Sequence, residues 1–268
     1  MFNSLPNAII KLLLLTVLPF GYCSALFAQS QQLRINQYDV PNLLGKVDID
    51  GELTESQWQQ ARKIELNVVT HPFENTLSPV TTEVLIFEDG ETLFVAFKAG
   101  DAEPEKIRAY FRDRDNVWND DIVGLTLDTF NDRRLAYQFF VNPHGIQADS
   151  IMNEMTGDES DSWDAIWQSA GKIIDQGYQV EIAIPLRVMN FVESDGKKTW
   201  GAEFIRYYPR EDRLRISNAP RDRNNACDLC QIGEVSGFAK AKQGKNIAVV
   251  PSLVLGKARN RALGDIEP

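Results

Sequence analysis

Apolar and polar residues alternate in three consecutive runs within residues 118–150, and this is the strongest structural signal in the chain. In IVGLTLD large aliphatic residues occupy alternate positions, and in RLAYQFFVN Leu, Tyr, Phe and Val recur at the same spacing. A period of two is typical of a β-strand with one face in a core. Residues 128–133 and 142–145 supply the Asp, Asn, Pro and Gly that turns favour, and IQADSI follows. We therefore predict a β-meander of three strands.

The same alternation continues on both sides of this meander. TTEVLIFE and TLFVAFKA flank a Glu-Asp-Gly-Glu turn, which predicts a hairpin, and YQVEIAI and TWGAEFIRYY predict two further strands. A short helix is expected within residues 46–63, with Trp58 and Ala61 facing the core, and a helical turn is expected to begin at Pro185. The pattern predicts an all-β chain with one or two short helices, in which Trp58 is structural.

Residues 1–28 have the order of a secretory signal peptide. Lys11 precedes the apolar run LLLLTVL, and small residues follow it. The run is too short to span a bilayer comfortably, and a retained N-terminal anchor is the alternative. We expect residues 29–45 to be extended, residues 46–240 to form one sandwich-sized domain, and residues 241–268 to be a linker or the start of a further region. The abrupt end of the chain is consistent with a piece of a longer protein.

The charge of the chain argues against nucleic acid as a partner. The net charge is −10, and removal of Lys11 with the signal peptide takes it to −11. Nucleic-acid binding relies on clustered Lys and Arg that neutralise phosphates, and the sequence has no Lys/Arg-rich block to offset this charge. We therefore expect no nucleic-acid partner, and the signal peptide predicts an exported protein.

Several motifs carry a family resemblance. Trp-Asn-Asp-Asp at residues 118–121 is followed by Leu-Asp-Thr-Phe-Asn-Asp-Arg-Arg and by Ala-Tyr-x-Phe-x-Val-Asn-x-x-Gly, and Gly-Tyr-x-x-Glu-Ile-x-Ile-Pro-Leu comes later. Together they resemble the family 9 carbohydrate-binding module-like domain, in the version at the N-terminus of Gram-negative outer-membrane proteins with a C-terminal barrel region of unassigned function. The resemblance runs from about Val47 to Phe238. It implies a jelly-roll-type β-sandwich located in the periplasm or at the outer membrane.

Aromatic and polar side chains in this region suit a sugar ligand. A sugar ring has a flat apolar C–H face and a belt of hydroxyls, so a protein binds it with aromatic surface and a few placed polar groups. The candidate ligand-binding residues are Trp118, Trp163, Trp167, Arg134 and Gln138. Gly124 has no side chain in mid-strand, which can permit close approach of a ligand or of another backbone. The alternative for each tryptophan is packing in the core.

The resemblance makes this site more specific. Sugar-binding members of the family use two stacking tryptophans, and the first maps onto Trp118, which polar residues surround. The second corresponds to Trp163 or Trp167, which would form the opposing wall of a shallow groove. Family members often have an acidic residue where Gly124 stands in this chain.

Two small groups of residues have other candidate roles. Asp128, Asn131 and Asp132 place hard oxygen ligands in one turn, which suits calcium, and turn capping is the alternative. Cys227 and Cys230 are the cysteines that follow the signal region. In an exported protein such a pair predicts a local disulfide, with a zinc or redox site as the alternative.

Residues 108–115 (RAYFRDRD) combine charge with aromatic rings just before Trp118. We expect them to form a solvated edge strand in which Arg and Asp side chains pair with one another. Direct contact with a ligand is the alternative.

Catalytic signatures are missing from the sequence. There is no Gly-x-Ser-x-Gly, the two histidines have no motif around them, and the acidic loop 152–162 is too irregular to assign acid and base roles. A haem-binding relative of the sandwich, with ligands drawn from His144, Met152 and Met155, is a minor alternative. We therefore expect a non-catalytic domain that binds an oligosaccharide or a related glycan. The second hypothesis is an interaction or plug module for its own barrel, without sugar affinity.

Overall fold

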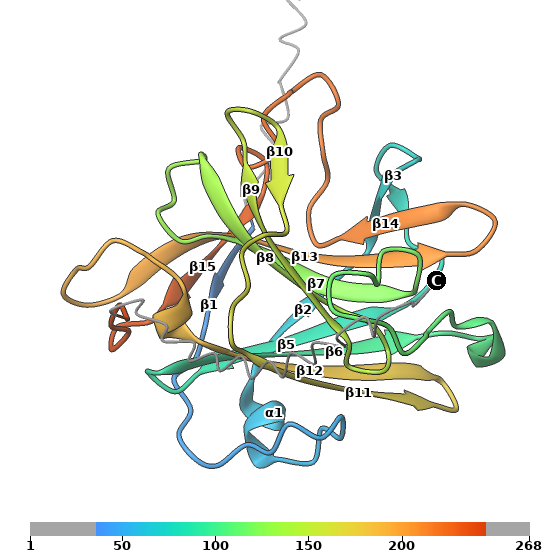
Figure 1. Cartoon of the computed structure of the whole chain (residues 1–268), viewed down its shortest axis with the longest axis horizontal. Helices are drawn as coiled ribbons and strands as arrows, with labels where there is room; N and C mark the ends of the chain where they lie inside the picture. The colour runs from blue at the N-terminus through green and yellow to red at the C-terminus, as the bar shows by residue number, and fades with distance from the viewer. Residues whose placement is uncertain (1–35, 245–268) are drawn as a thin grey trace, which may run out of the picture. The chain divides into compact units, whose positions relative to one another are not determined.

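Two β-sheets pack face to face in the computed structural model, which describes residues 36–244 (Figure 1). The ten-stranded sheet has the order β10-β9-β8-β7-β13-β14-β3-β4, with β15 and β1 attached beside β13. Its strands are β1 (Gln37–Asp39), β3 (Val68–His71), β4 (Thr76–Leu77), β7 (Ile122–Asp128), β8 (Leu135–Val141), β9 (Gln147–Asn153), β10 (Asp158–Ser160), β13 (Lys198–Pro209), β14 (Arg213–Ser217) and β15 (Gly233–Gly237).

The second sheet has five strands in the order β11-β12-β6-β5-β2. They are β2 (Arg62–Glu65), β5 (Thr82–Glu88), β6 (Thr92–Gly100), β11 (Gln168–Ile174) and β12 (Gly177–Pro185). The described helices are short: α1 (Ser56–Gln60), η1 (Pro104–Lys106) and η2 (Leu186–Val188). The predicted all-β sandwich of jelly-roll type with short helices is confirmed, and so is the meander β7-β8-β9.

Strand alternation determines which side chains enter the core. Along β7, Val123, Leu125 and Leu127 point between the two sheets and are fully buried, as the sequence period predicts. Phe139 on β8 and Phe204 on β13 join the same core. The intervening residues of these three strands therefore form the outer face of the ten-stranded sheet, away from the five-stranded one.

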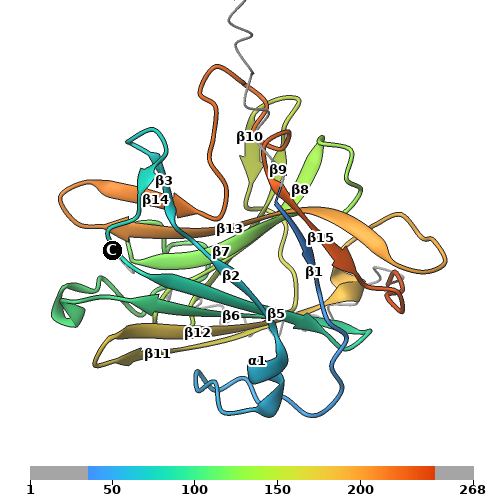
Figure 2. The same cartoon turned by 180° about the vertical axis from the view of Figure 1, so that it is seen from behind.

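Part of the outer face of the five-stranded sheet is covered. Helix α1 lies against it, on the side away from the ten-stranded sheet (Figures 1 and 2). Trp58 is 2% exposed and meets Phe87 edge to face at 4.9 Å between ring centroids. Leu43, Val47 and other residues before the helix complete this second apolar cluster. The predicted structural role of Trp58 is confirmed.

The start of the described chain is part of the sheet. Strand β1 pairs in parallel with β15, through Gln37–Glu234 and its neighbours, so part of the segment predicted to lie extended is a paired strand. The predicted signal peptide and most of the region after residue 240 lie outside the described residues. Among residues 36–244, no helix has the length and apolar character needed to cross a membrane.

Candidate binding site

Cross-strand rows of side chains form the outer face of the ten-stranded sheet. One row is polar and runs from Ser150 through Gln138 and Thr126 to Glu203 on four adjacent strands. The next row is mainly apolar and contains Ala148, Phe140, Gly124 and Ile205 in the same strand order. Because opposed residues on adjacent strands lie about 4.5–5.5 Å apart, each row is a continuous surface.

Phe140 fills the space above Gly124. A Cβ atom at Gly124 would lie 2.4 Å from Phe140 Cδ1 and 2.3 Å from the Phe139 carbonyl oxygen. Glycine is therefore needed here so that the Phe140 ring can lie close to the sheet. The expectation that a ligand approaches at Gly124 is wrong, because a protein side chain occupies this space.

Trp118 lies at the aromatic end of the outer face. Its ring meets Phe140 at 5.4 Å with an interplanar angle of 64°, and the side chain is half-buried. Tyr207 packs in the same cluster, and the Arg213 guanidinium lies 3.9 Å from the centre of the Tyr207 ring. Arg213 Nη2 also donates to the Trp118 carbonyl oxygen at 2.9 Å, which fixes this segment to β14.

A buried carboxylate lies at the charged end of the same face. Arg215 donates through both terminal nitrogens to Glu203, with each N–O distance 2.8 Å. Arg221 Nη2 donates to Glu203 Oε2 at 2.8 Å, and Ser217 Oγ donates to Oε1 at 2.7 Å. Burial by itself would raise the pKa of Glu203, but the two guanidinium groups outweigh it and lower the pKa to about 2. Glu203 is therefore ionised at neutral pH.

The loop between β14 and β15 forms a wall beside this face. Arg221 ties the loop to Glu203, and Glu154 accepts hydrogen bonds from the backbone N–H groups of Asp228 and Leu229 at 3.0 and 2.9 Å. Leu229 is buried in a small cluster that also includes Met152. Residues 218–232 are thus held beside β13 and β9 by charge, backbone hydrogen bonds and apolar contact.

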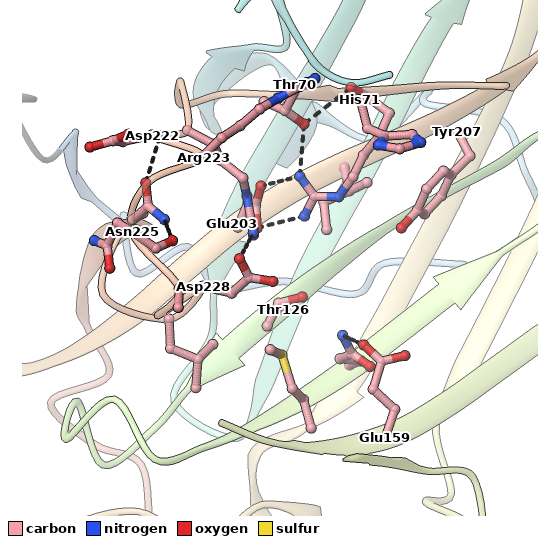
Figure 3. A pocket seen from close by; sticks show the side chains of 18 of the residues that line it. Thr70, His71, Thr126, Glu159, Glu203, Tyr207, Asp222, Arg223, Asn225 and Asp228 are labelled. Atoms are coloured by element: carbon pink, nitrogen blue, oxygen red, sulfur yellow. Dashed lines mark hydrogen bonds and ion pairs between the residues drawn. The ribbon is translucent and has the colours of Figure 1, made fainter. Parts of the chain in front are cut away.

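The sheet face and this loop enclose a pocket with a volume of about 600 Å³. Trp118, Phe140 and Tyr207 line its aromatic part, and Gln138 and Thr126 line its floor. Figure 3 shows Glu203 in the charged part, with Thr126 and Glu159 farther along the pocket. The other lining residues include Thr70, His71, Arg215, Arg221, Asp222, Arg223, Asn225 and Asp228.

The structure brings together two of the five predicted ligand-binding residues. Trp118 and Gln138 both line the pocket. Gln138 is buried, accepts a hydrogen bond from Ser150 Oγ at 2.6 Å and donates to Glu159 at 3.2 Å. Arg134 lies elsewhere: it is exposed before the start of β8, where its backbone N–H donates to Asp132.

Trp163 and Trp167 lie on the opposite face of β8 from Trp118. Trp163 packs on Tyr137 at 4.9 Å and on Phe139 at 5.8 Å, and both partners point toward the inner core. Trp167 is 5% exposed and also meets Phe139, at 5.4 Å. The prediction that one of these residues forms a wall opposite Trp118 is wrong, because the sheet itself separates them.

In the predicted calcium turn, some side-chain oxygens cap the backbone and others have no protein partner. Asp128 Oδ2 accepts the backbone N–H of Arg133 at 2.8 Å, and Asp132 Oδ1 accepts that of Arg134 at 3.1 Å. The Asn131 side-chain amide donates to Glu234. Asp128 Oδ1 and Asn131 Oδ1 are buried without a protein partner. These two oxygens suit a cation, so calcium at this turn stays a prediction.

The predicted local disulfide is present in the structure. Cys227 and Cys230 are joined by a disulfide with a Cα–Cα distance of 5.3 Å, within the loop that forms the wall of the pocket.

The three candidate haem ligands are spread along the chain around β9. His144 precedes β9, whereas Met152 is near its end and Met155 follows it. Because a strand rises about 3.3 Å per residue, His144 is too far from Met152 and from Met155 for one iron to bind His144 together with either methionine.

The residues at the charged end of the pocket were not predicted from the sequence. Glu203 is on β13, Arg215 is on β14 and Arg221 is in the following loop, and all three are far along the chain from the motifs around Trp118. The alternation in TWGAEFIRYY was the available signal, because it places Glu203 and Tyr207 on the face opposite Phe204. What alternation does not reveal is that β13 pairs with β7.

Solved structures with the same fold include carbohydrate-binding proteins. A candidate carbohydrate-binding protein from Bacteroides uniformis is 15% identical, with a TM-score of 0.60 over 75% of this chain and 99% of its own. A family 9 carbohydrate-binding module from Caldicellulosiruptor kristjanssonii in complex with cellotriose is 17% identical, with a TM-score of 0.53 over 82% of this chain and 100% of its own. The same module in complex with glucose matches at the same identity and TM-score over 81% of this chain and 100% of its own.

A family assignment rests on the sequence itself. No curated protein matches the chain significantly. The model of the carbohydrate family 9 binding domain-like family matches residues 49–217, which is more than half of the chain and includes strands of both sheets. The chain therefore belongs to the carbohydrate family 9 binding domain-like family.

Proposed function

We propose that this domain binds a carbohydrate, without catalysis, in the pocket between the outer face of the ten-stranded sheet and loop 218–232. The observation that carries the proposal is the composition of this pocket. An aromatic part with Trp118 and Tyr207 adjoins a polar part with Gln138 and Glu203 in a volume of about 600 Å³. A sugar ring needs both: apolar surface for its C–H face and fixed hydrogen-bonding groups for its hydroxyls.

The charged part of the pocket is preorganised for polar recognition. Glu203 accepts four hydrogen bonds from Arg215, Arg221 and Ser217, so these guanidinium groups are held in place before a ligand arrives. A planar guanidinium offers several N–H donors in a fixed geometry, which suits adjacent ring hydroxyls. Rigid polar groups lose little conformational entropy on binding, so they favour affinity and specificity.

The same network argues against acid–base catalysis by Glu203. A general acid needs a proton near neutral pH. The pKa of Glu203 is about 2, and both of its oxygens already accept hydrogen bonds. Glu203 therefore positions other groups, which supports a binding domain.

The relatives support the same ligand class. The modules from Caldicellulosiruptor kristjanssonii hold cellotriose and glucose, and they share the fold of this chain. We take a hexose-containing oligosaccharide as the ligand class for this pocket.

A glycan array tests this function directly. The full chain and a Trp118→Ala variant would be applied to the same array of oligosaccharides. The proposal predicts that the wild-type protein binds at least one glycan and that Trp118→Ala loses that signal. Absence of binding to every glycan, or equal binding by the variant, would contradict it.

We further propose that the domain is exported and forms the periplasmic or surface head of an outer-membrane protein. The signal-peptide pattern of residues 1–28 and the disulfide between Cys227 and Cys230 support export. Cell fractionation should find the protein in the outer-membrane fraction, processed so that residues 1–28 are removed. Recovery of the unprocessed chain from the cytoplasm would contradict this proposal.

A further inference from the structure

An exposed pair of stacked rings lies outside the pocket. The Phe111 and His144 rings are parallel to within 8°, with centroids 4.4 Å apart. Phe111 is nevertheless 80% exposed, so its ring face away from His144 is open to solvent. A phenyl ring at this exposure contributes little apolar burial to the stability of the fold.

A buried polar pair holds both rings in position. Asn142 Nδ2 donates to the Tyr110 carbonyl oxygen at 2.9 Å and to Asp120 Oδ2 at 3.0 Å. The backbone N–H of Tyr110 donates to Asp120 Oδ2 at 3.2 Å, and that of His144 donates to Asn142 Oδ1 at 3.0 Å. Asp120 and Asn142 are both fully buried. The residue before Phe111 and the backbone of His144 are thus anchored to one rigid group in the core.

This arrangement differs from the predicted edge strand. Residues 108–115 form a loop in which Arg112 Nε donates to Asp120 at 3.3 Å and Arg114 Nε donates to Asp149 at 2.9 Å. The arginines therefore pair with buried carboxylates of other segments. With Arg112 and Arg114 paired to these carboxylates, the loop presents Phe111 outward.

We propose that the stacked pair of Phe111 and His144 is a second carbohydrate-contact site, on which one pyranose ring stacks through its C–H face. This inference rests on the proposed function, because it assumes that the domain encounters glycans. Two features support it: the open ring face, and the anchored backbone with the stacked His144 ring, which lowers the entropy cost of ordering the Phe111 ring on binding. The site has few directional polar groups, so it is expected to be weak, tolerant of sugar identity and useful on polymeric glycans.

Solution NMR with labelled phenylalanine rings tests this site. The chain has 14 phenylalanines, and the ring signal that disappears in Phe111→Ala identifies Phe111. Cellotriose, xylotriose and mannotriose would be added separately to the wild-type protein and to Trp118→Ala. The proposal predicts that the Phe111 ring signal shifts with trisaccharide concentration in both proteins, because ring stacking does not require the pocket. Phe130, also exposed but on the β7–β8 turn, is the matched control whose signal should stay unchanged.

The outcomes separate this inference from the proposed function. If other signals shift but Phe111 does not, the second site is overturned and the pocket stands. If Phe111 shifts only when Trp118 is present, the ring responds to the pocket and is not a site. A shift that follows protein concentration instead of sugar indicates self-association and overturns the inference. If no ring signal responds to any of the three sugars, the inference is overturned as well, and the glycan array decides the pocket independently.

Discussion

The outer faces of the two sheets arise from the same strand alternation, but the segments that lie over or beside them differ. On the five-stranded sheet, helix α1 and the segment before it cover the face and bury Trp58. On the ten-stranded sheet, loop 218–232 stands beside the face, and Trp118 stays half-buried at the edge of a pocket. Whether a tryptophan that packs on an outer sheet face is fully buried or half-buried therefore depends on how the neighbouring segments cover that face.

The two faces also hold buried carboxylates in different surroundings. Glu181, below Trp58, accepts hydrogen bonds from the Trp58 indole and from the backbone N–H groups of Asp50 and Gly51. Burial raises the pKa of Glu181 to about 7 despite these donors, whereas two guanidinium groups lower that of Glu203 to about 2. The carboxylate of the covered face thus holds a segment of chain in place, and that of the open face holds two arginines at the pocket.

The largest expected effect is on the covered face. Trp58→Ala should lower the free energy of unfolding by about 3–5 kcal/mol, because it leaves a cavity in a packed cluster. It also removes the indole N–H that donates to Glu181 at 2.9 Å. Denaturant unfolding measures the change, with Trp58→Phe as a control that keeps most of the apolar volume. A loss below about 1 kcal/mol would show that the face is not a true core.

Acid should destabilise the open face through Glu203. Its pKa is about 2 in the folded protein and near 4.5 in the unfolded chain. The group therefore contributes stability above about pH 4.5, and this contribution of about 3 kcal/mol is lost as the pH falls toward 2. Glu203→Gln should remove that part of the pH dependence. Identical slopes for the wild type and the variant between pH 4.5 and 2 would contradict the role assigned to the two arginines.

The disulfide in loop 218–232 should contribute less to the free energy of unfolding. Joining Cys227 to Cys230 closes a very short loop, for which chain entropy gives a stabilisation of about 2 kcal/mol. Thiol titration of the denatured, non-reduced mature protein should find no free thiol, and Cys227→Ser with Cys230→Ser should lower stability by about this amount. Two free thiols in the mature protein would contradict the disulfide.

The smallest expected effect concerns the turn at Asp128, Asn131 and Asp132. Calcium bound only to the folded protein would stabilise it by about 1.4 kcal/mol for each tenfold excess over the dissociation constant. A chelator should then lower the melting temperature and added calcium should restore it. An unchanged melting curve would leave these side chains with turn capping alone.

The sequence was sufficient to predict the elements that depend on local pattern. Val123, Leu125 and Leu127 are buried as the period of two requires, and Trp58 is in a core. Trp118 was distinguishable as a surface residue because polar residues flank it. These inferences depend on neighbours along the chain, so a single sequence contains the information for them.

The missed features depend on contacts between distant segments. Trp163 is in a loop, and only the fold shows that it packs on Tyr137 and Phe139 from the inner side. Gly124 was interpreted as space, but the neighbouring strand brings Phe140 over it. Strand order and the course of loops are set by long-range packing, and one sequence read locally does not reveal them.

Trp118 and Trp163 differ in their proposed roles: Trp118 belongs to a ligand site and Trp163 to the packing of the sandwich. Both are half-buried tryptophans, so each alanine variant should lower the free energy of unfolding by about 1–2 kcal/mol. The direct measurement is titration calorimetry of the two variants against a glycan that the wild-type protein binds, together with their denaturant unfolding. We expect Trp118→Ala to lose binding and Trp163→Ala to retain it at similar stability. Retained binding by Trp118→Ala, or loss only in Trp163→Ala, would contradict it.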